Sequence, residues 1–199
     1  MIFSSYYDVF LATGKVKRII PPAFRFRILR KEPATLISRN IIGPPSVVMY
    51  RNDGLHCYDA GLKWLVDIDM YVRRLEHDKI VYLPEPLIKV GVGIDQVTAS
   101  VHGAPDVEVP EYFQFLHKTG IHKLKNILVY DAWWRFIRNF QLFSEAEVAS
   151  YGYKEDIHPV LSNMMRWQKG LPLFILKIGI FSKTIMFLHF LLNRNKLSQ

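Results

Sequence analysis

The clearest pattern of local structure lies in residues 42–75, I-G-P-P-S-V-V-M-Y-R-N-D-G-L-H-C-Y-D-A-G-L-K-W-L-V-D-I-D-M-Y-V-R-R-L, and the rest of the chain is organised around it. It opens with a rigid Gly-Pro-Pro turn at 43–45, and a β-branched run over 47–50 then predicts a strand. The Asn-Asp-Gly sequence at 52–54 consists of residues that favour turns. We therefore expect a loop, a strand and a turn in the first part of this stretch.

A helix is expected in the second part. Apolar residues recur there at spacings of three, four and three, namely Leu65, Ile68, Val72 and Leu75. This spacing is that of one face of an α-helix. Asp67 stands where the helix would begin and Asp69 falls in its first turn, where free N–H groups and the helix dipole favour negative charge.

Four blocks in and beyond this stretch carry a family resemblance. They are G-P-P-S-x-V-M-Y-R, Tyr58-Asp59, K-W-L-V-D-I-D-M-Y-V-R and Y-L-P-E-P-L. In this order they resemble the second half of a family 2 glycosyltransferase of the GT-A fold, a family that makes cell-envelope or capsular polysaccharide. The resemblance runs from about Phe3 to Thr98. It implies an α/β fold that is the acceptor-side part of a Rossmann-like GT-A domain.

The resemblance also implies roles for individual residues. Asp67 matches the general base, which takes a proton from the acceptor hydroxyl as that oxygen attacks the anomeric carbon. Asp69 matches the second acidic position and Arg73 the following arginine, both supporting the site. The acceptor wall would consist of Gly43, Pro44, Pro45 and Ser46. Val66 replaces the glutamate that usually precedes the base.

Two other interpretations of these carboxylates remain open. Asp67 could serve only as a helix N-cap, with Asp69 complementing the helix dipole. Asp67-Ile68-Asp69 is also the only D-x-D string in the chain, and such a string binds a divalent cation in nucleotide-sugar enzymes. The helical spacing that follows favours the base motif over the metal motif.

The nucleotide-binding half of the family has no match in this chain. The family would place its opening strands and its metal-binding D-x-D before the strand expected at residues 2–7. We therefore expect an N-terminally incomplete glycosyltransferase, with a separate N-terminal half as a further partner. The family requires Mg²⁺ or Mn²⁺, but its D-x-D ligand motif is not in this chain, so the sequence predicts no metal site here.

Charge and composition divide the 199 residues into two parts. The net charge is +8, and residues 112–199 hold 12 Lys and Arg against 5 Asp and Glu. A polar, proline-bounded stretch at 106–110 marks the boundary, so we expect an acceptor-side domain at 1–108 and a basic helical tail at 109–199. Cys57 is the only cysteine, which excludes an intrachain disulfide and fits a reducing compartment.

Several further elements follow from short patterns. Strands are expected at 2–7, 79–83 and 87–92, with Pro84-Glu85-Pro86 closing the second. Alternating aromatic and basic residues at 24–31 predict another strand, either a charged edge or a groove for a phosphorylated acceptor. A helix is expected to start at Ser144-Glu145-Ala146-Glu147, and two helices between 113 and 140 should break near Thr119-Gly120.

The most apolar segment lies at residues 171–192. It is long enough to span a membrane, but Lys177, Lys183 and His189 interrupt it. We therefore expect a helix in the membrane interface, with a spanning helix and a buried helix as alternatives. The cluster W-W-R-F-I-R at 133–138 contains residue types enriched at such interfaces. The expected location is cytoplasmic, peripheral on the inner face of the cell membrane.

These observations predict an enzyme that transfers a sugar from a nucleotide sugar to a hydroxyl of a glycan or glycolipid. The alternative is a non-catalytic remnant or membrane-associated scaffold that keeps the acceptor-side fold. We expect no nucleic-acid partner, because the basic charges of the tail are interleaved with a membrane-length apolar run. The histidines and Cys57 show no spacing typical of zinc.

Overall fold

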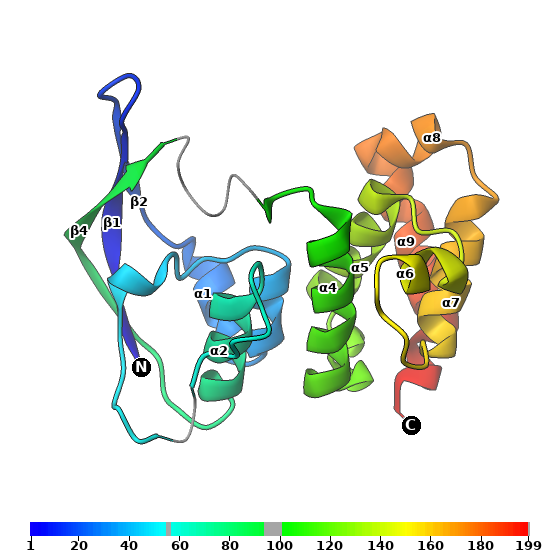
Figure 1. Ribbon diagram of the computed structural model, residues 1–199, viewed down its shortest axis with the longest axis horizontal. Coiled ribbons are helices and arrows are strands. Elements are labelled where there is room, and N and C mark those ends of the chain that lie inside the picture. Colours follow the sequence, from blue (N-terminus) through cyan, green and yellow to red (C-terminus); the bar gives the residue numbers. More distant parts are fainter. Residues whose placement is uncertain (55–56, 94–100, 199) are drawn as a thin grey trace. The chain divides into compact units, whose positions relative to one another are not determined.

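The computed structural model describes residues 1–54, 57–93 and 101–198 (Figure 1). The chain divides into two compact units, Met1–Ala104 and Pro105–Gln199. We expected the boundary after residue 108, whereas the units divide after Ala104, four residues earlier. Residue 108 therefore lies inside the first helix of the second unit. The chain is mixed α/β, as predicted, with all of its described strands in the first unit.

A four-stranded sheet organises the first unit. Its central strand is β1 (Ile2–Phe10), as the sequence predicts. The strands β2 (Val16–Ile19) and β3 (Val48–Met49) pair antiparallel with different parts of β1, whereas β4 (Val81–Val92) pairs with it in parallel. The turn between β1 and β2 contains Gly14 at φ 67°, a conformation that glycine adopts without strain.

The strand β4 replaces the two strands expected at 79–83 and 87–92. The prolines at 84 and 86 were expected to end the first one, and this was wrong. The register of β1 against β4 shifts between Ser4 and Tyr6, where the proline segment pairs. Such a bulge lets a strand continue past residues that cannot donate a backbone hydrogen bond.

The strand expected over the alternating segment is also wrong, because residues 23–29 form the helix α1 (Ala23–Leu29). Its Phe26 ring packs 5.8 Å from the ring of Phe3 and 5.9 Å from that of Tyr82, measured between centroids. Helical geometry places Phe26 and the buried Leu29 on this inner side together. Figure 1 shows α1 and α2 (Val66–Leu75) on the same side of the sheet.

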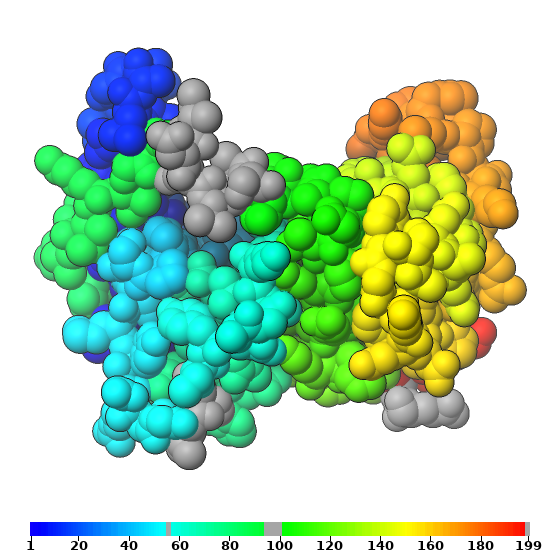
Figure 2. All heavy atoms as spheres, in the orientation of Figure 1, coloured from blue at the N-terminus to red at the C-terminus, as the bar shows by residue number. Residues whose placement is uncertain are grey.

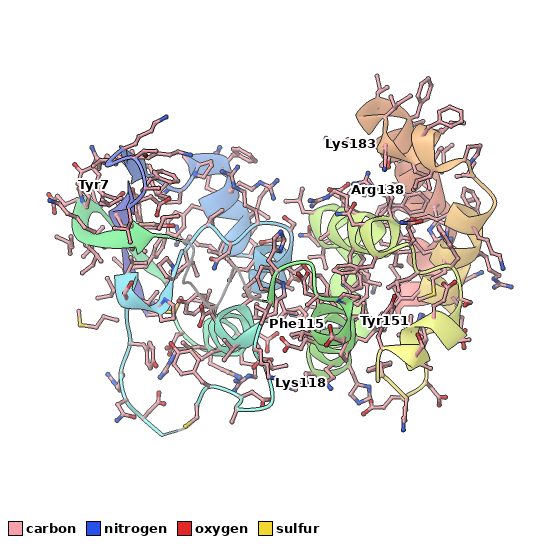
Figure 3. The ribbon with its side chains drawn as sticks, turned by 45° about the horizontal axis from the view of Figure 1, so that its top comes forward. Tyr7, Phe115, Lys118, Arg138, Tyr151 and Lys183 are labelled. Atoms are coloured by element: carbon pink, nitrogen blue, oxygen red, sulfur yellow. The ribbon has the colours of Figure 1, made fainter. Side chains whose placement is uncertain are left out.

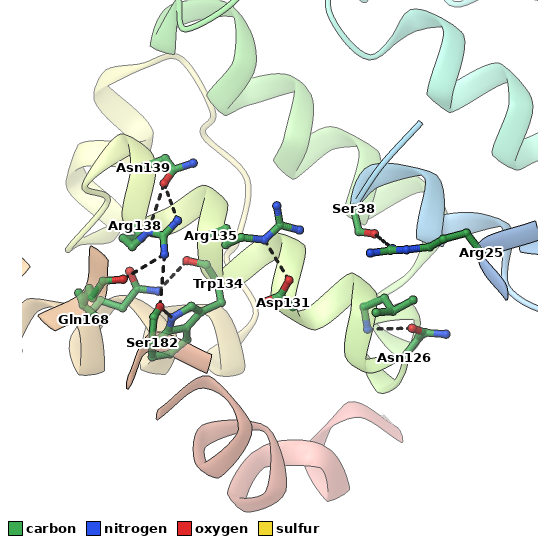
Figure 4. Close-up of polar contacts among 12 residues, drawn as sticks. Arg25, Ser38, Asn126, Asp131, Trp134, Arg135, Arg138, Asn139, Gln168 and Ser182 are labelled. Atoms are coloured by element: carbon green, nitrogen blue, oxygen red, sulfur yellow. Dashed lines mark hydrogen bonds and ion pairs between the residues drawn. The ribbon is translucent and has the colours of Figure 1, made fainter. Parts of the chain in front are cut away.

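Short 3-10 turns connect these elements. One is η1 (Pro33–Ile37), where the Glu32 side chain accepts a hydrogen bond from the Ala34 N–H. The Arg25 guanidinium donates to the Ser38 hydroxyl at 2.8 Å and so ties α1 to the end of η1 (Figure 4). Of the strand expected over 47–50, two residues form β3, while Val47 ends η2 (Pro45–Val47).

The described part of the second unit is helical. Its elements are α4 (Pro105–Thr119), η3 (Ile121–Lys125), α5 (Ile127–Phe140), α6 (Glu145–Ser150), α7 (Pro159–Lys169), α8 (Leu173–Lys177), α9 (Gly179–Asn193) and η4 (Arg194–Ser198). The stretch 106–110 is therefore not a linker, since Pro110 is accommodated inside α4. The expected break at Gly120 and the expected helix start at Ser144 are both confirmed, the latter with a full capping box.

The core of this unit surrounds α5. Trp133 and Trp134 are 0% and 1% exposed, so the cluster at 133–138 is core packing and not the membrane contact we had expected. The ring of Trp133 packs edge-on against Phe113 and Phe136. The spacing of this cluster is helical, and its aromatic side chains face inward because the neighbouring helices supply aromatic partners.

The apolar segment 171–192 is not one helix. It breaks at Ile178, which has an extended conformation and separates α8 from α9. The Arg138 guanidinium donates to the Leu176 carbonyl at 3.0 Å, which satisfies a backbone group at the end of α8 (Figure 4). None of the described helices is long and apolar enough to cross a membrane.

Candidate functional site

Asp67 lies in the first turn of α2 (Val66–Leu75), where the sequence predicts it. The N-cap of this helix is Leu65, which has no capping side chain, so Asp67 does not act as the N-cap. The carboxylate is half-buried, and burial raises its pKa above the usual value. A carboxylate near a helix start with a raised pKa can hold or accept a proton at milder pH than an ordinary aspartate.

Asp69 and Arg73 form a pair one helical turn apart. Asp69 is fully buried, and its Oδ2 accepts from Arg73 Nε at 2.8 Å and lies 2.7 Å from Arg73 Nη2. Arg73 Nη2 also donates to the Cys57 carbonyl at 2.8 Å. The pair therefore fastens the segment around Cys57 to α2, which is a positioning role.

Asp67 and Asp69 do not form a metal site together. Residues two apart on an α-helix point about 200° apart, so the two carboxylates face different sides of α2. Asp69 is already engaged by Arg73. Among the described residues, no group of three or more His, Cys, Asp or Glu side chains is placed to hold a metal ion.

Tyr6, Tyr50, Tyr58 and Tyr71 form a cluster in which Tyr58 and Tyr71 lie near Asp67. Burial raises the pKa of the Tyr71 hydroxyl, and the negative charges of Asp67 and of the other tyrosines raise it further. Burial, a hydrogen bond with Tyr50 and the charges of Tyr50 and Asp67 together raise the pKa of Tyr58. The fourth member is Tyr6 of β1, whose pKa is raised by burial and by Asp8. The phenols of Tyr6, Tyr58 and Tyr71 therefore stay neutral and can both donate and accept hydrogen bonds.

No site role was expected for these tyrosines, although Tyr50, Tyr58 and Tyr71 lie in the blocks that carry the resemblance. Tyr71 follows Asp67 by four residues, so the helical spacing of this pair was available as a signal. Tyr6, Tyr50 and Tyr58 come from β1 and from the segment before α2, and no local spacing connects them with Asp67.

The turn at Gly43 contacts two of these tyrosines, Tyr6 and Tyr71. Gly43 is buried at φ 102°, and a Cβ atom built on it would lie 2.7 Å from Tyr6 Cε1, so only glycine fits. The Asn40 side chain accepts from the Gly43 N–H at 3.0 Å, and the Tyr71 hydroxyl donates to the Gly43 carbonyl at 3.3 Å. Of the expected acceptor-wall residues, Gly43 thus contacts the tyrosines, while Pro45 and Ser46 are exposed in η2 and Pro44 is its N-cap.

Arg74 is a second support that the sequence did not reveal. Its side chain is 1% exposed, and its guanidinium pairs with Asp53 at 3.0 Å and Asp78 at 3.2 Å. It also donates to the Arg51 carbonyl and lies 4.6 Å from the centre of the Tyr50 ring. Arg74 therefore fixes the segment that carries Tyr50 against α2.

A pocket lies beside α1, where a groove for a phosphorylated acceptor was one expectation. Its volume is about 420 Å³. Apolar and aromatic residues line most of it, among them Phe26 and Tyr82, together with Arg18 and Arg27. Arg18 donates to the Pro84 carbonyl at 2.8 Å, which orients its side chain at the pocket.

After β4, the structure describes the chain again from residue 101. His102 stacks on Trp64, with ring centroids 5.0 Å apart.

Comparisons with protein-family models, with curated proteins and with solved structures found no match to this chain.

Proposed function

We propose that the first unit is the acceptor side of a GT-A glycosyltransferase and that Asp67 is its general base. The observation that supports this most is the half-buried Asp67 carboxylate, whose pKa is raised by burial and which lies beside the neutral hydroxyls of Tyr58 and Tyr71. A base works best when its pKa lies near the operating pH.

In the proposed reaction, an acceptor hydroxyl oxygen attacks the anomeric carbon of a nucleotide sugar. The bond between that carbon and the nucleotide diphosphate breaks, and the hydroxyl proton moves to Asp67. Inversion at the anomeric carbon is what the family resemblance implies.

The tyrosines and the Asp69–Arg73 pair would serve this reaction in different ways. Neutral phenols can hydrogen-bond to sugar hydroxyls, and their rings offer flat apolar faces to a sugar ring. Asp69 and Arg73 would hold the segment at Cys57 in place and would not touch the reacting atoms. The pocket with Arg18 and Arg27 suits the phosphate and apolar part of a glycolipid acceptor.

The residues that the structure describes do not fit the Mg²⁺ or Mn²⁺ site of the family. Asp67 and Asp69 face different sides of α2, and the described residues hold no other cluster of ligands. The proposal therefore takes no step through a metal.

The test is nucleotide-sugar binding and turnover by wild type and Asp67→Asn. Calorimetry with UDP-, GDP- and dTDP-sugars, with and without Mn²⁺, would find the donor, and release of the nucleotide diphosphate would report turnover. We expect turnover that Asp67→Asn reduces at least about 100-fold, since general-base catalysis contributes that much. Donor binding should remain. Equal turnover by both proteins would show that Asp67 is not the base.

The second candidate is a non-catalytic remnant or membrane-associated scaffold that keeps the acceptor-side fold and binds glycans through its tyrosines. It predicts no turnover with any donor, even when a donor-binding half from a related enzyme is supplied. It also predicts glycan binding that Tyr58→Phe weakens, because that change removes one hydroxyl and keeps the ring. Binding to acceptor glycans without turnover would support this candidate over the enzyme.

A further inference from the structure

The helix α9 turns its polar residues inward and its apolar residues outward. Its buried side carries Ser182, His189 and Asn193 together with Met186 and Phe190. Its other side carries six large apolar side chains that are 44% to 73% exposed, namely Ile180, Phe181, Phe187, Leu188, Leu191 and Leu192. This is the reverse of an ordinary surface helix, whose apolar stripe faces the core.

Specific polar contacts fix this orientation. The Ser182 hydroxyl accepts from Trp134 Nε1 at 3.1 Å and from Arg138 at 3.3 Å (Figure 4). His189 Nδ1 shares a 2.5 Å hydrogen bond with the Tyr130 hydroxyl, and the buried Asn193 accepts from Asn163 at 3.2 Å. Rotating α9 to bury its apolar side would break these contacts, so the outward apolar face is built into the fold.

The short helix α8 extends the same face. Phe174 is 67% exposed, and Ile178, at the junction between the two helices, is 43% exposed. Figure 3 shows side chains projecting outward from the orange ribbon around the labelled Lys183, and Figure 2 shows α8 at the surface of its unit. We call this set of eight apolar residues the α8–α9 face. A contiguous apolar face of this kind marks a docking site.

The charges around the α8–α9 face indicate what covers it. Residues 157–199 contain no Asp or Glu and six basic residues, all exposed, namely Arg166, Lys169, Lys177, Lys183, Arg194 and Lys196. Apolar side chains flanked by lysines suit the boundary between anionic headgroups and acyl chains. Two copies of so basic a surface would repel each other, which disfavours a second copy of the chain as the occupant.

We propose that the α8–α9 face docks on an anionic phospholipid surface, with α9 lying parallel to it. At 15 residues α9 is shorter than the roughly 20 residues a spanning helix needs, which favours the parallel orientation. This proposal stands whether or not the first unit transfers sugars.

The first experiment is co-sedimentation of the full chain with vesicles. We expect binding to vesicles of phosphatidylcholine with phosphatidylglycerol, weakened several-fold between 50 and 500 mM salt, and little binding to phosphatidylcholine alone, since screening removes the attraction of the lysines. Absence of binding to either vesicle, or equal binding to both, would overturn the proposal.

Two variants then test the face itself. Phe187→Gln combined with Leu188→Gln should weaken vesicle binding about tenfold or more, because it removes two apolar anchors. The matched control is Leu11→Gln combined with Val16→Gln at the exposed β1–β2 hairpin, which should bind as wild type does. Equal weakening by both pairs would overturn the assignment to this face.

A second copy of the chain is the competing occupant. Light scattering without vesicles would detect a dimer, and a dimer that the Phe187 and Leu188 changes dissolve would overturn the lipid proposal. A monomer in both proteins supports it. Circular dichroism checks that the variants fold, and the lipid and salt dependence of the wild type decides the proposal even if they do not.

Discussion

The helices α2 and α9 both bury polar side chains, but of different kinds and with different results. α2 buries the charged Asp69 and Arg74. Asp69 pairs with Arg73 of the same helix, and Arg74 pairs with Asp53, Asp78 and the Arg51 carbonyl. α9 buries the neutral Ser182, His189 and Asn193, which pair with other helices. In α2 the pairs hold loops that surround Asp67, whereas in α9 they turn an apolar face outward.

This difference shows that buried polar contacts decide which face of a helix remains for function. Charged residues need full compensation when buried, so α2 recruits whole segments to supply it. Neutral residues need only one or two partners, so α9 can be oriented by a few hydrogen bonds. Removing such contacts should therefore affect the two helices to different extents.

The largest effect is expected for Arg74→Ala in α2. The change removes the partner of Asp53 and Asp78, the hydrogen bond to the Arg51 carbonyl and the packing on Tyr50. We expect the free energy of unfolding to fall by about 3 kcal/mol, as when a buried ion pair loses one member. Urea denaturation followed by circular dichroism measures this.

Arg39→Ala is the matched control, because Arg39 is an exposed arginine of the same unit. It should change the free energy of unfolding by less than about 0.5 kcal/mol. If both variants lose the same stability, the buried ion pairs of Arg74 do not stabilise the protein more than an exposed arginine does.

An intermediate effect is expected for His189 in α9. Burial lowers its pKa to about 4, the backbone of Asn163 opposes this shift, and Lys196 adds to it. A histidine with a lowered folded-state pKa contributes stability that is complete above about pH 6.5 and is lost as the pH falls towards 4. The second unit should lose on the order of 2 kcal/mol over this range.

Tryptophan fluorescence can follow this loss, since Trp133, Trp134 and Trp167 lie in the second unit. His189→Gln should be less stable at pH 7 and should lose less stability on acidification. Burial also lowers the pKa of His158, so some pH dependence will remain in the variant. The control is His122→Gln, which changes an exposed histidine of the same unit. A His189→Gln slope equal to that of wild type would show that His189 is not the buried titrating group.

The sequence predicted those parts of the fold whose signals are local. The spacing from Leu65 to Leu75 predicted α2, and Ser144 with Glu147 predicted a capped helix start. The alternation at 24–27 is too short to separate a strand from a helix, and the packing of Phe26 on rings from other segments decided it. Likewise, 171–192 could not be divided without knowing that Arg138 binds the end of α8.

The candidate site follows the same rule. Asp67, Asp69 and Arg73 stand on one helix, so their places were predictable, and the pairing of Asp69 with Arg73 follows from a spacing of four. Tyr6 and Tyr58 could not be assigned, because only the folded chain brings Tyr58 to Asp67 and Tyr6 to Tyr71. The direction of the apolar face of α9 was equally hidden, because its polar residues find their partners on α5 and α7.

The smallest effect separates the two acidic residues of α2. Burial raises the folded-state pKa of Asp67, so its contribution to stability is complete below the unfolded pKa of about 3.9 and is lost as the pH rises through the folded pKa. Asp67→Asn should therefore stabilise the protein at pH 7, by about 0.5 kcal/mol because water screens this half-buried position. It should give no gain at pH 3.

Asp69→Asn should instead destabilise the protein, because Arg73 loses its charged partner. Urea titrations at both pH values decide this. A loss of stability in Asp67→Asn at pH 7 would mean that Asp67 supports the fold as Asp69 does, which would remove the main argument for its role as a base.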